Sequence, residues 1–147
     1  KNFVVQTEHE KVQADSLVVA TGGLSIPKIG ATDFGYRLAR QFGLPVTDVR
    51  AGLVPLTFSA SVLAFCKALA GLSVDAMVSC SAASFREGLL FTHRGLSGPS
   101  VLQISSYWQT GEKILIDLAP DMHLSKKLQE VKLSQGKSDI LTVMAKI

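Results

Sequence analysis

The chain has 147 residues, of which 47% are hydrophobic and 18% are charged, and its formal net charge at pH 7 is +3. This composition excludes a disordered chain, and the length suits one domain or two small ones. The lysines and arginines are scattered along the sequence, so the charge permits nucleic-acid contact without indicating it. No signal peptide and no apolar run long enough to span a bilayer is present, so we expect no membrane partner.

The two cysteines, Cys66 and Cys80, form neither a CxxC pair nor a metal-ligand arrangement. They are predicted to be reduced core residues of a cytoplasmic protein. The three histidines, His9, His93 and His123, have no metal-site spacing with them either. We therefore expect no metal site.

The first part of the chain predicts strands. Residues 3–7 and 11–15 flank a polar turn and predict a β-hairpin. Residues 17–20 (Leu-Val-Val-Ala) predict a buried parallel strand that ends at Gly22 and Gly23. Glycines at the carboxyl end of such a strand let the backbone approach a ligand, although the same pattern also ends strands that bind nothing.

A helix is predicted next, capped by Thr32 or Asp33 and continuing to about Phe42, with Gly43 as its stop. Gly35 lies in its first turn, where glycine is a weak helix former. Two explanations remain open for this glycine. It permits either close packing or access of a ligand to the helix N-terminus.

The pattern changes near residues 47–51, which we interpret as a boundary between a segment of residues 1–48 and a domain of residues 49–147. The second part predicts irregular strands at 49–60, a short helix at 61–70, strands at 72–79, 85–92 and 113–118, and a helix at 99–108. A further helix has Leu124, Leu128 and Val131 on one face. Ser138 or Asp139 is predicted to cap a final helix.

Residues 93–99 (His-Arg-Gly-Leu-Ser-Gly-Pro) are predicted to form a glycine-rich loop between a strand and a helix. The backbone N–H groups of an exposed helix start attract anions, and His93 and Arg94 could add proton transfer or charge. An ordinary turn is the alternative. A hydrolase nucleophile at Ser97, with His93 or His123 as its base, is a weaker hypothesis, because a nucleophile elbow needs glycine where Pro99 stands.

Four stretches taken together carry a family resemblance. They are residues 18–27 (Val-Val-Ala-Thr-Gly-Gly-Leu-Ser-Ile-Pro), 30–39 (Gly-Ala-Thr-Asp-Phe-Gly-Tyr-Arg-Leu-Ala), 53–56 (Leu-Val-Pro-Leu) and 89–99 (Leu-Leu-Phe-Thr-His-Arg-Gly-Leu-Ser-Gly-Pro). In this order they resemble the BaiN/YhiN-like family of FAD-dependent flavoproteins of the two-dinucleotide-binding-domain type. The resemblance implies an α/β (α+β) fold: partial Rossmann-like FAD-domain strands, followed by an inserted β-barrel-like domain with helices.

The resemblance also implies functional residues. The cofactor-binding set beside FAD would be Ala20, Thr21, Gly22, Gly23, Ser25, Pro27, Gly30, Thr32 and Gly35. The substrate-side loop would be Thr92, Arg94, Gly95, Ser97 and Gly98, with His93 as a candidate catalytic acid.

The resemblance implies an oxidoreductase that passes hydride from NAD(P)H through FAD to an unsaturated substrate, either a steroid-like enone or a uridine base in ribosomal RNA. The sequence contains no G-x-G-x-x-G, the motif that cradles the FAD pyrophosphate. We therefore expect a fragment of a longer flavoprotein that binds FAD poorly by itself. A substrate- or RNA-binding insert domain without chemistry of its own is the alternative.

Overall fold

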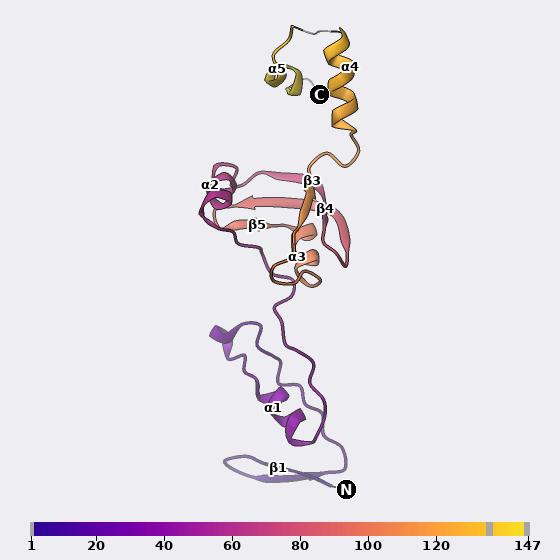
Figure 1. The fold of residues 1–147 in the computed structure, drawn as a ribbon. Helices are drawn as coiled ribbons and strands as arrows, with labels where there is room; N and C mark the ends of the chain where they lie inside the picture. The colour runs from indigo at the N-terminus through magenta and orange to yellow at the C-terminus, as the bar shows by residue number, and fades with distance from the viewer. Residues whose placement is uncertain (1, 135–136, 146–147) are drawn as a thin grey trace. The chain divides into compact units, whose positions relative to one another are not determined.

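The computed structural model describes residues 2–134 and 137–145 (Figure 1). The chain divides into two compact units, Lys1–Arg50 and Ala51–Ile147.

The first unit begins with the predicted hairpin, which is confirmed. Strands β1 (Phe3–Gln6) and β2 (Lys11–Ala14) pair antiparallel. The hydroxyl of Thr7 accepts a hydrogen bond from the Glu10 N–H at 3.0 Å, and the Thr7 N–H donates to the Glu10 carbonyl at 2.9 Å. These bonds close the turn, because they give hydrogen-bond partners to backbone groups that have none on the opposite strand.

The predicted helix of this unit is also confirmed, as α1 (Phe34–Gln41), preceded by the short 3₁₀ helix η1 (Pro27–Ile29). Asp33 occupies the N-cap position of α1. At the other end Gly43 has φ of +71°, and its N–H donates to the Arg40 carbonyl. The Leu44 N–H donates to the Ala39 carbonyl at 2.9 Å, which completes a Schellman motif.

The strand predicted at residues 17–20 is wrong for the described structure, because this segment has no regular secondary structure and pairs with no strand. A buried parallel strand needs a neighbour on each edge for its N–H and C=O groups. Among the described residues, the sheet of this unit consists of β1 and β2 alone. The apolar side chains therefore stay open to solvent, and Val18 is 85% exposed.

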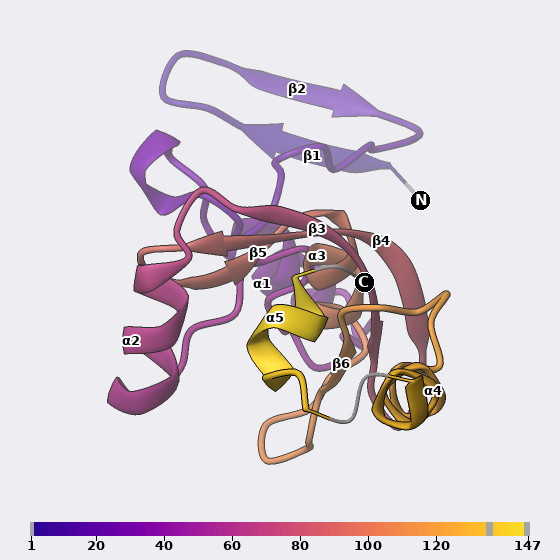
Figure 2. The same cartoon turned by 90° about the horizontal axis from the view of Figure 1, so that it is seen from above.

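The second unit is a curled antiparallel half-barrel with helices, which confirms the predicted α/β fold with a barrel-like domain. Its sheet has the strand order β5–β4–β3–β6 (Figure 2). The strands are β3 (Ser73–Ser79), β4 (Ser84–Thr92), β5 (Gly95–Ser97) and β6 (Leu115–Asp117). The helices are α2 (Ala60–Ala68), α3 (Pro99–Ser105), α4 (Leu124–Ser134) and α5 (Ile140–Met144).

Most predicted elements of this unit are present with shifted ends. The helix predicted at 99–108 ends at Ser105, and the strand predicted at 113–118 is confined to β6. Residues 49–59 form no named strand, and only Leu56 bridges to Leu96. The side chain of Asp139 caps α5 by accepting from the Leu141 N–H at 3.2 Å, as predicted. Gln135, Gly136 and Lys137 predict a break between the last two helices, and this stretch lies partly outside the described residues.

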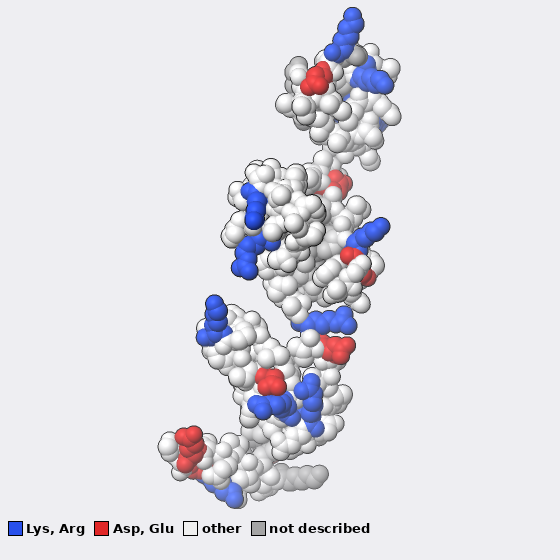
Figure 3. Space-filling model, turned by 60° about the vertical axis from the view of Figure 1, so that its left-hand side comes forward, with Lys and Arg blue, Asp and Glu red and all other residues white. Residues whose placement is uncertain are grey.

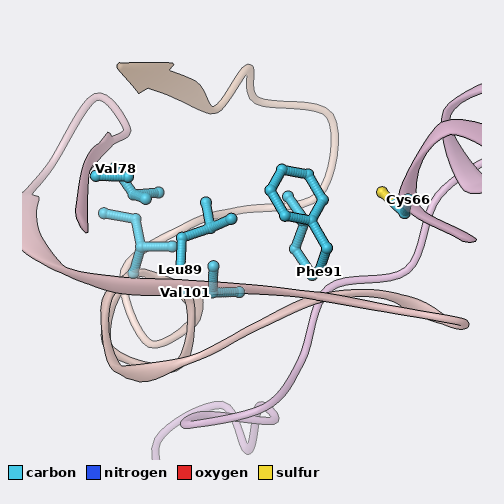
Figure 4. Close-up of a cluster of buried hydrophobic side chains, with 8 residues drawn as sticks. Cys66, Val78, Leu89, Phe91 and Val101 are labelled. Atoms are coloured by element: carbon cyan, nitrogen blue, oxygen red, sulfur yellow. The ribbon is translucent and has the colours of Figure 1, made fainter. Parts of the chain in front are cut away.

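The buried core of the second unit lies between the sheet and α3. Leu89, Val78, Val101 and Ile104 are fully buried there, and Figure 4 shows Val78, Leu89 and Val101 packed beside one another. Cys66 of α2 is buried too, and both cysteines are free thiols, as predicted. Alternation of apolar residues along β3 and β4 explains this core, because every second side chain of a strand points to the same face.

No helix within residues 2–134 and 137–145 has both the length and the apolar character needed to cross a membrane.

Two glycines with nearly equal positive φ, one crowded and one open, test how much this packing matters. Gly98 and Gly111 have φ of +94° and +95°. A Cβ on Gly98 would lie 2.5 Å from the Gly88 carbonyl oxygen, whereas a Cβ on Gly111 would meet nothing within 4 Å. We expect Gly98→Ala to lower the free energy of unfolding by about 3 kcal/mol and Gly111→Ala by about 1 kcal/mol, measured by urea denaturation. Equal losses would contradict the packing account.

Candidate functional site

The glycine-containing segment of the first unit lies against the start of α1. A Cβ on Gly35 would lie 3.2 Å from the Thr21 hydroxyl oxygen and 3.7 Å from a methyl carbon of Val19. A Cβ on Gly23 would lie 2.6 Å from the Tyr36 hydroxyl oxygen. Both glycines therefore permit close packing of this segment on the helix, which is one of the two explanations that the sequence left open for Gly35.

Gly22 and Gly30 differ from these two, because they are exposed and uncrowded. Their φ angles are +70° and +90°, a conformation that favours glycine, and an added Cβ would meet nothing within 4 Å at either position. Gly30 ends η1, with its N–H donating to the Pro27 carbonyl at 3.1 Å. The backbone at these two positions is open to a flat ligand, which is the property that a flavin-lining segment needs.

The remaining predicted cofactor residues are side chains on the same exposed segment. Ala20, Ser25, Pro27 and Thr32 are all exposed. The Thr32 hydroxyl accepts a hydrogen bond from the Phe34 N–H at 3.4 Å, so it helps to start α1. No carboxylate or imidazole belongs to this set, and its chemistry is therefore limited to binding through backbone and hydroxyl groups.

An apolar hollow of about 570 Å³ lies beside the glycine segment. It is lined by the hairpin, by residues 17–19 and 21, and by α1, and Phe3 and Phe42 stack edge to face with ring centroids 6.0 Å apart. None of the described residues of the first unit is buried. Such a large uncovered apolar surface is typical of a face that packs against more protein or a ligand.

The loop conformation predicted for residues 93–99 is partly wrong, whereas the substrate-side role of these residues stays a prediction. His93 and Arg94 form a two-residue turn, and the residues after them form strand β5, which pairs with β4, instead of a loop. The Thr92 hydroxyl donates to the Gly95 carbonyl at 3.0 Å and accepts from the Arg94 N–H at 3.2 Å. Thr92 therefore closes this β4–β5 hairpin, and the side chains of His93 and Arg94 are exposed at its tip.

Gly95 and Gly98 have structural explanations. A Cβ on Gly95 would lie 2.1 Å from the Leu56 carbonyl oxygen, and a Cβ on Gly98 would clash with the backbone of β4. Only glycine allows these close approaches, because any Cβ would collide with main-chain atoms. Their place in the loop does not by itself indicate a ligand.

The start of α3 also differs from the prediction of exposed N–H groups. Ser100 and Val101 are fully buried, and the Ser100 hydroxyl donates to the Gly88 carbonyl at 3.1 Å. The structure gives the hydrolase hypothesis no support, since Ser97 is the last residue of β5 and the turn into α3 is made by Gly98. Within the described part of the chain, no hydrogen bond joins the Ser97 hydroxyl to the His93 or His123 imidazole.

One charged cluster was missed by the sequence analysis. Arg86 on β4 donates to the Asp75 carboxylate through Nε at 3.1 Å and through Nη2 at 2.8 Å, and it also binds both carboxylate oxygens of Asp121. The hydrogen bond to Asp121, which has the larger effect, and the hydrogen bond to Asp75 both raise the pKa of Arg86 above its ordinary value. The hydrogen bond from Arg86 lowers the pKa of Asp121. No pattern in the sequence joins Arg86 and Asp121, because they lie 35 residues apart.

A smaller hollow of about 260 Å³ lies inside the curled sheet, lined mainly by apolar side chains together with Trp108 and Glu112. The Trp108 indole N–H donates to the Glu112 carbonyl at 2.9 Å. The Glu112 carboxylate accepts from the Ser81 hydroxyl at 2.6 Å and from the Gln109 N–H at 3.0 Å, and these bonds lower its pKa. These polar groups are occupied by the protein, so the hollow offers an apolar lining and little else.

Within the ranges that the structure describes, no group of three histidine, cysteine, aspartate or glutamate side chains could hold a metal ion.

The second unit matches a family model described as the HI0933-like protein barrel and H2TH domain, over residues 50–147. The chain belongs to this family, and the resemblance to BaiN/YhiN-like flavoproteins drawn from the sequence is confirmed. Two relatives are ribosomal RNA dihydrouridine synthases. The chain is 46% identical to that of Escherichia coli over 144 residues, and 44% identical to that of Haemophilus influenzae over 146 residues.

A third relative is the 3-dehydro-bile acid delta(4,6)-reductase of Clostridium scindens, to which the chain is 31% identical over 137 residues. These matches cover 97%, 99% and 86% of this chain, but only 36%, 36% and 33% of the respective relatives. The chain therefore spans about a third of the length of the curated relatives it matches.

The Arg86 cluster gives a pH prediction. The pKa of Asp121 is lowered from 3.8 in the folded protein, so its ionised form stabilises the fold above pH 3.8, and this contribution disappears as the pH falls through the lowered pKa. We expect Asp121→Asn to reduce Tm slightly at neutral pH, because the pair is exposed, and to flatten the fall of Tm between about pH 4 and pH 2.

Glu87→Gln serves as the control, because it removes a carboxylate next to Arg86 on β4 and leaves the contacts of Arg86 with Asp75 and Asp121 intact. Thermal melting of the three proteins across this pH range measures the effect. Identical Tm curves for Asp121→Asn and wild type would rule out a stabilising contact.

Proposed function

We propose that this chain is part of an FAD-dependent oxidoreductase that uses NAD(P)H to reduce a uridine base in ribosomal RNA. The observation that carries the proposal is the identity of 46% and 44%, over nearly the whole chain, to two ribosomal RNA dihydrouridine synthases. The bile acid reductase is less similar, at 31% identity. A steroid-like enone is therefore the second candidate substrate.

The first unit would supply one side of the flavin site. Gly22 and Gly30 would line the cofactor, since their backbone is exposed and no side chain crowds it. Gly23 and Gly35 would keep the segment close to α1. Bound flavin would supply hydride transfer to the substrate, while these residues bind and orient it.

The rest of the flavin site would come from outside this sequence. No G-x-G-x-x-G is present, so the pyrophosphate cradle would belong to another part of a longer protein, and this chain by itself would bind FAD poorly. Residues 17–20 would pair with strands from the same part. Their exposed apolar side chains and the uncovered hollow beside them support this view.

The β4–β5 hairpin would face the substrate. Reduction of a double bond next to a carbonyl adds a hydride to one carbon and a proton to its neighbour, so the reaction needs a proton donor. His93 is the candidate, because its imidazole is exposed at the hairpin tip and histidine is the side chain that most often acts as a general acid in enzymes. Thr92, which closes the hairpin turn, would hold it in place, and Arg94 and Ser97 would contact the substrate.

A second candidate function is binding without chemistry. The second unit has a buried core of its own, whereas no described residue of the first unit is buried. The second unit would then fold as an insert that recognises RNA or another substrate, and catalysis would depend wholly on other parts of the longer protein.

The test uses a full-length protein that contains this chain. Purified with FAD and supplied with NADPH or NADH, it should reduce uridine in ribosomal RNA that lacks dihydrouridine, measured by mass spectrometry as a gain of two hydrogens. We expect His93→Ala to lower the rate of base reduction at least about 100-fold and to leave flavin reduction by NAD(P)H unchanged.

His123→Ala is the matched control and should keep full activity. Equal rates for the two variants would remove His93 from the mechanism. Reduction of a steroid-like enone but not of RNA would favour the second substrate, and a protein that takes up no flavin would refute the proposed function.

A further inference from the structure

Two long stretches of the sequence contain no aspartate or glutamate, residues 51–74 and 88–111. The fold brings them together at one end of the second unit. Helix α2 packs against β4 and β5. The segment after α2 also joins the end of β4, where the Gly71 N–H donates to the Phe91 carbonyl at 2.9 Å and the Phe91 N–H donates to the Leu72 carbonyl at 2.9 Å. This end of the unit therefore carries no carboxylate from either stretch.

Helix α2 exposes an apolar face at this end. Cys66 points into the core and is 1% exposed, whereas Val62 and Phe65, one turn apart, are 43% and 58% exposed. The ring of Phe65 lies edge to face with the buried ring of Phe91, with centroids 6.0 Å apart. This contact fixes the Phe65 ring while it leaves much of the side chain open to solvent. A fixed, exposed aromatic ring is a platform on which a flat molecule can stack.

Basic side chains lie at the same end of the unit as Phe65. Lys67 follows Phe65 on α2, and the hairpin tip adds Arg94 and His93, all of them exposed. Three other arginines, Arg37, Arg50 and Arg86, are paired with aspartates. In the part of the chain that the structure describes, Lys67 and Arg94 make no ion pair. Figure 3 shows basic side chains at one edge of this unit without an acidic side chain beside them.

We propose that this surface, formed by Val62, Phe65, Lys67, His93 and Arg94 and called here the α2–hairpin surface, binds a single-stranded segment of RNA. One base stacks on Phe65, Arg94 at the hairpin tip contacts a phosphate next to it, and Lys67, which lies on a different side of α2 from Phe65, contacts a phosphate further along the strand. The inference rests on the proposed function, which supplies RNA as the substrate, and adds the place on this chain where RNA binds.

The chemistry of the surface favours RNA over the other candidates. Single-stranded RNA is recognised by aromatic stacking combined with cationic contacts to phosphate, and this surface offers both. A bile-acid-like enone would use the aromatic ring and its one carboxylate could pair with one cation, but it would leave the other cation without a partner. A protein segment that covered α2 would need carboxylates to pair with Lys67 and Arg94.

The experiment measures binding of a fluorescein-labelled single-stranded oligouridine to the intact chain by fluorescence anisotropy, over a range of KCl concentrations. Phe65→Leu keeps an apolar side chain against Phe91 and removes the flat face. We expect it to weaken binding about tenfold. The double variant Lys67→Gln/Arg94→Gln should make the plot of log K against log salt less steep by about 1.4, since each phosphate contact on a single strand contributes about 0.7.

The matched control is Lys11→Gln/Lys28→Gln, which removes the same charge from the first unit and should change neither affinity nor slope beyond a small general effect. Thermal melting confirms that each variant is folded, and the exposed Lys67/Arg94 pair tests the inference even if Phe65→Leu unfolds. The inference is overturned if the chain does not bind oligouridine, if both double variants weaken binding equally, or if only a steroid-like enone binds.

This binding assay contains no flavin and no reductant, so its outcome is independent of reductase activity. RNA binding that depends on the α2–hairpin surface in a protein without reductase activity would support the inference and refute the proposed function. If the full-length protein reduces RNA, and Phe65→Leu and the Lys67/Arg94 double variant change neither this activity nor RNA binding, the proposed function is supported and the inference is refuted.

Discussion

The close approach of Gly98 to strand β4 is the contact on which the second unit depends. A Cβ at this position would lie 2.5 Å from the Gly88 carbonyl oxygen and 2.9 Å from the Leu90 nitrogen, so only glycine lets the chain turn here from β5 into α3. That turn places α3 on the sheet, where Val101 and Ile104 are fully buried. Burial of each such side chain stabilises a fold by roughly 1.5–3 kcal/mol. The close approach of Gly98 to β4 therefore helps to place the helix that covers one side of the core.

The two units differ in what supports them. The core of the second unit holds the β4–β5 hairpin, so His93 and Arg94 are exposed on a fixed support. The first unit has an uncovered apolar hollow and open backbone at Gly22 and Gly30. A segment with few buried contacts gains order when a ligand or more protein covers it. This difference agrees with the proposed roles, in which the second unit carries the surface for the substrate and the first unit binds the cofactor.

Local patterns in the sequence were sufficient to predict much of the fold. The hairpin at the start, the Gly43 stop of α1, strands β3 and β4, and the Asp139 cap depend on residues close together in the chain. Residues 17–20 were predicted as a strand because their composition suits one, but a strand also needs partners, and composition does not reveal these. The four motifs identified the family because each of them is a short run of neighbouring residues.

Long-range contacts account for what the sequence did not reveal. Strand β5 exists because residues 95–97 pair with the end of β4 and Leu96 pairs with Leu56, and these pairings outweigh the preference of a glycine-rich stretch for a loop. The Arg86 cluster depends on a carboxylate 35 residues away. The α2–hairpin surface likewise joins a helix and a turn about 25 residues apart, so its cations appear scattered in the sequence. The sequence likewise does not distinguish the open glycines, Gly22 and Gly30, from the packed ones, Gly23 and Gly35, because the difference lies in contacts with other parts of the chain.

Hydrogen–deuterium exchange on a full-length protein that contains this chain, with and without FAD, tests whether the open glycine segment lines the cofactor. Amides of residues 20–35 should exchange more slowly when FAD is bound, because the cofactor covers the open backbone around Gly22 and Gly30. Strands β3 and β4 and helix α3 should exchange slowly in both states, because their core does not depend on the cofactor. Exchange of residues 20–35 at the same rate with and without FAD would show that this segment does not line the cofactor.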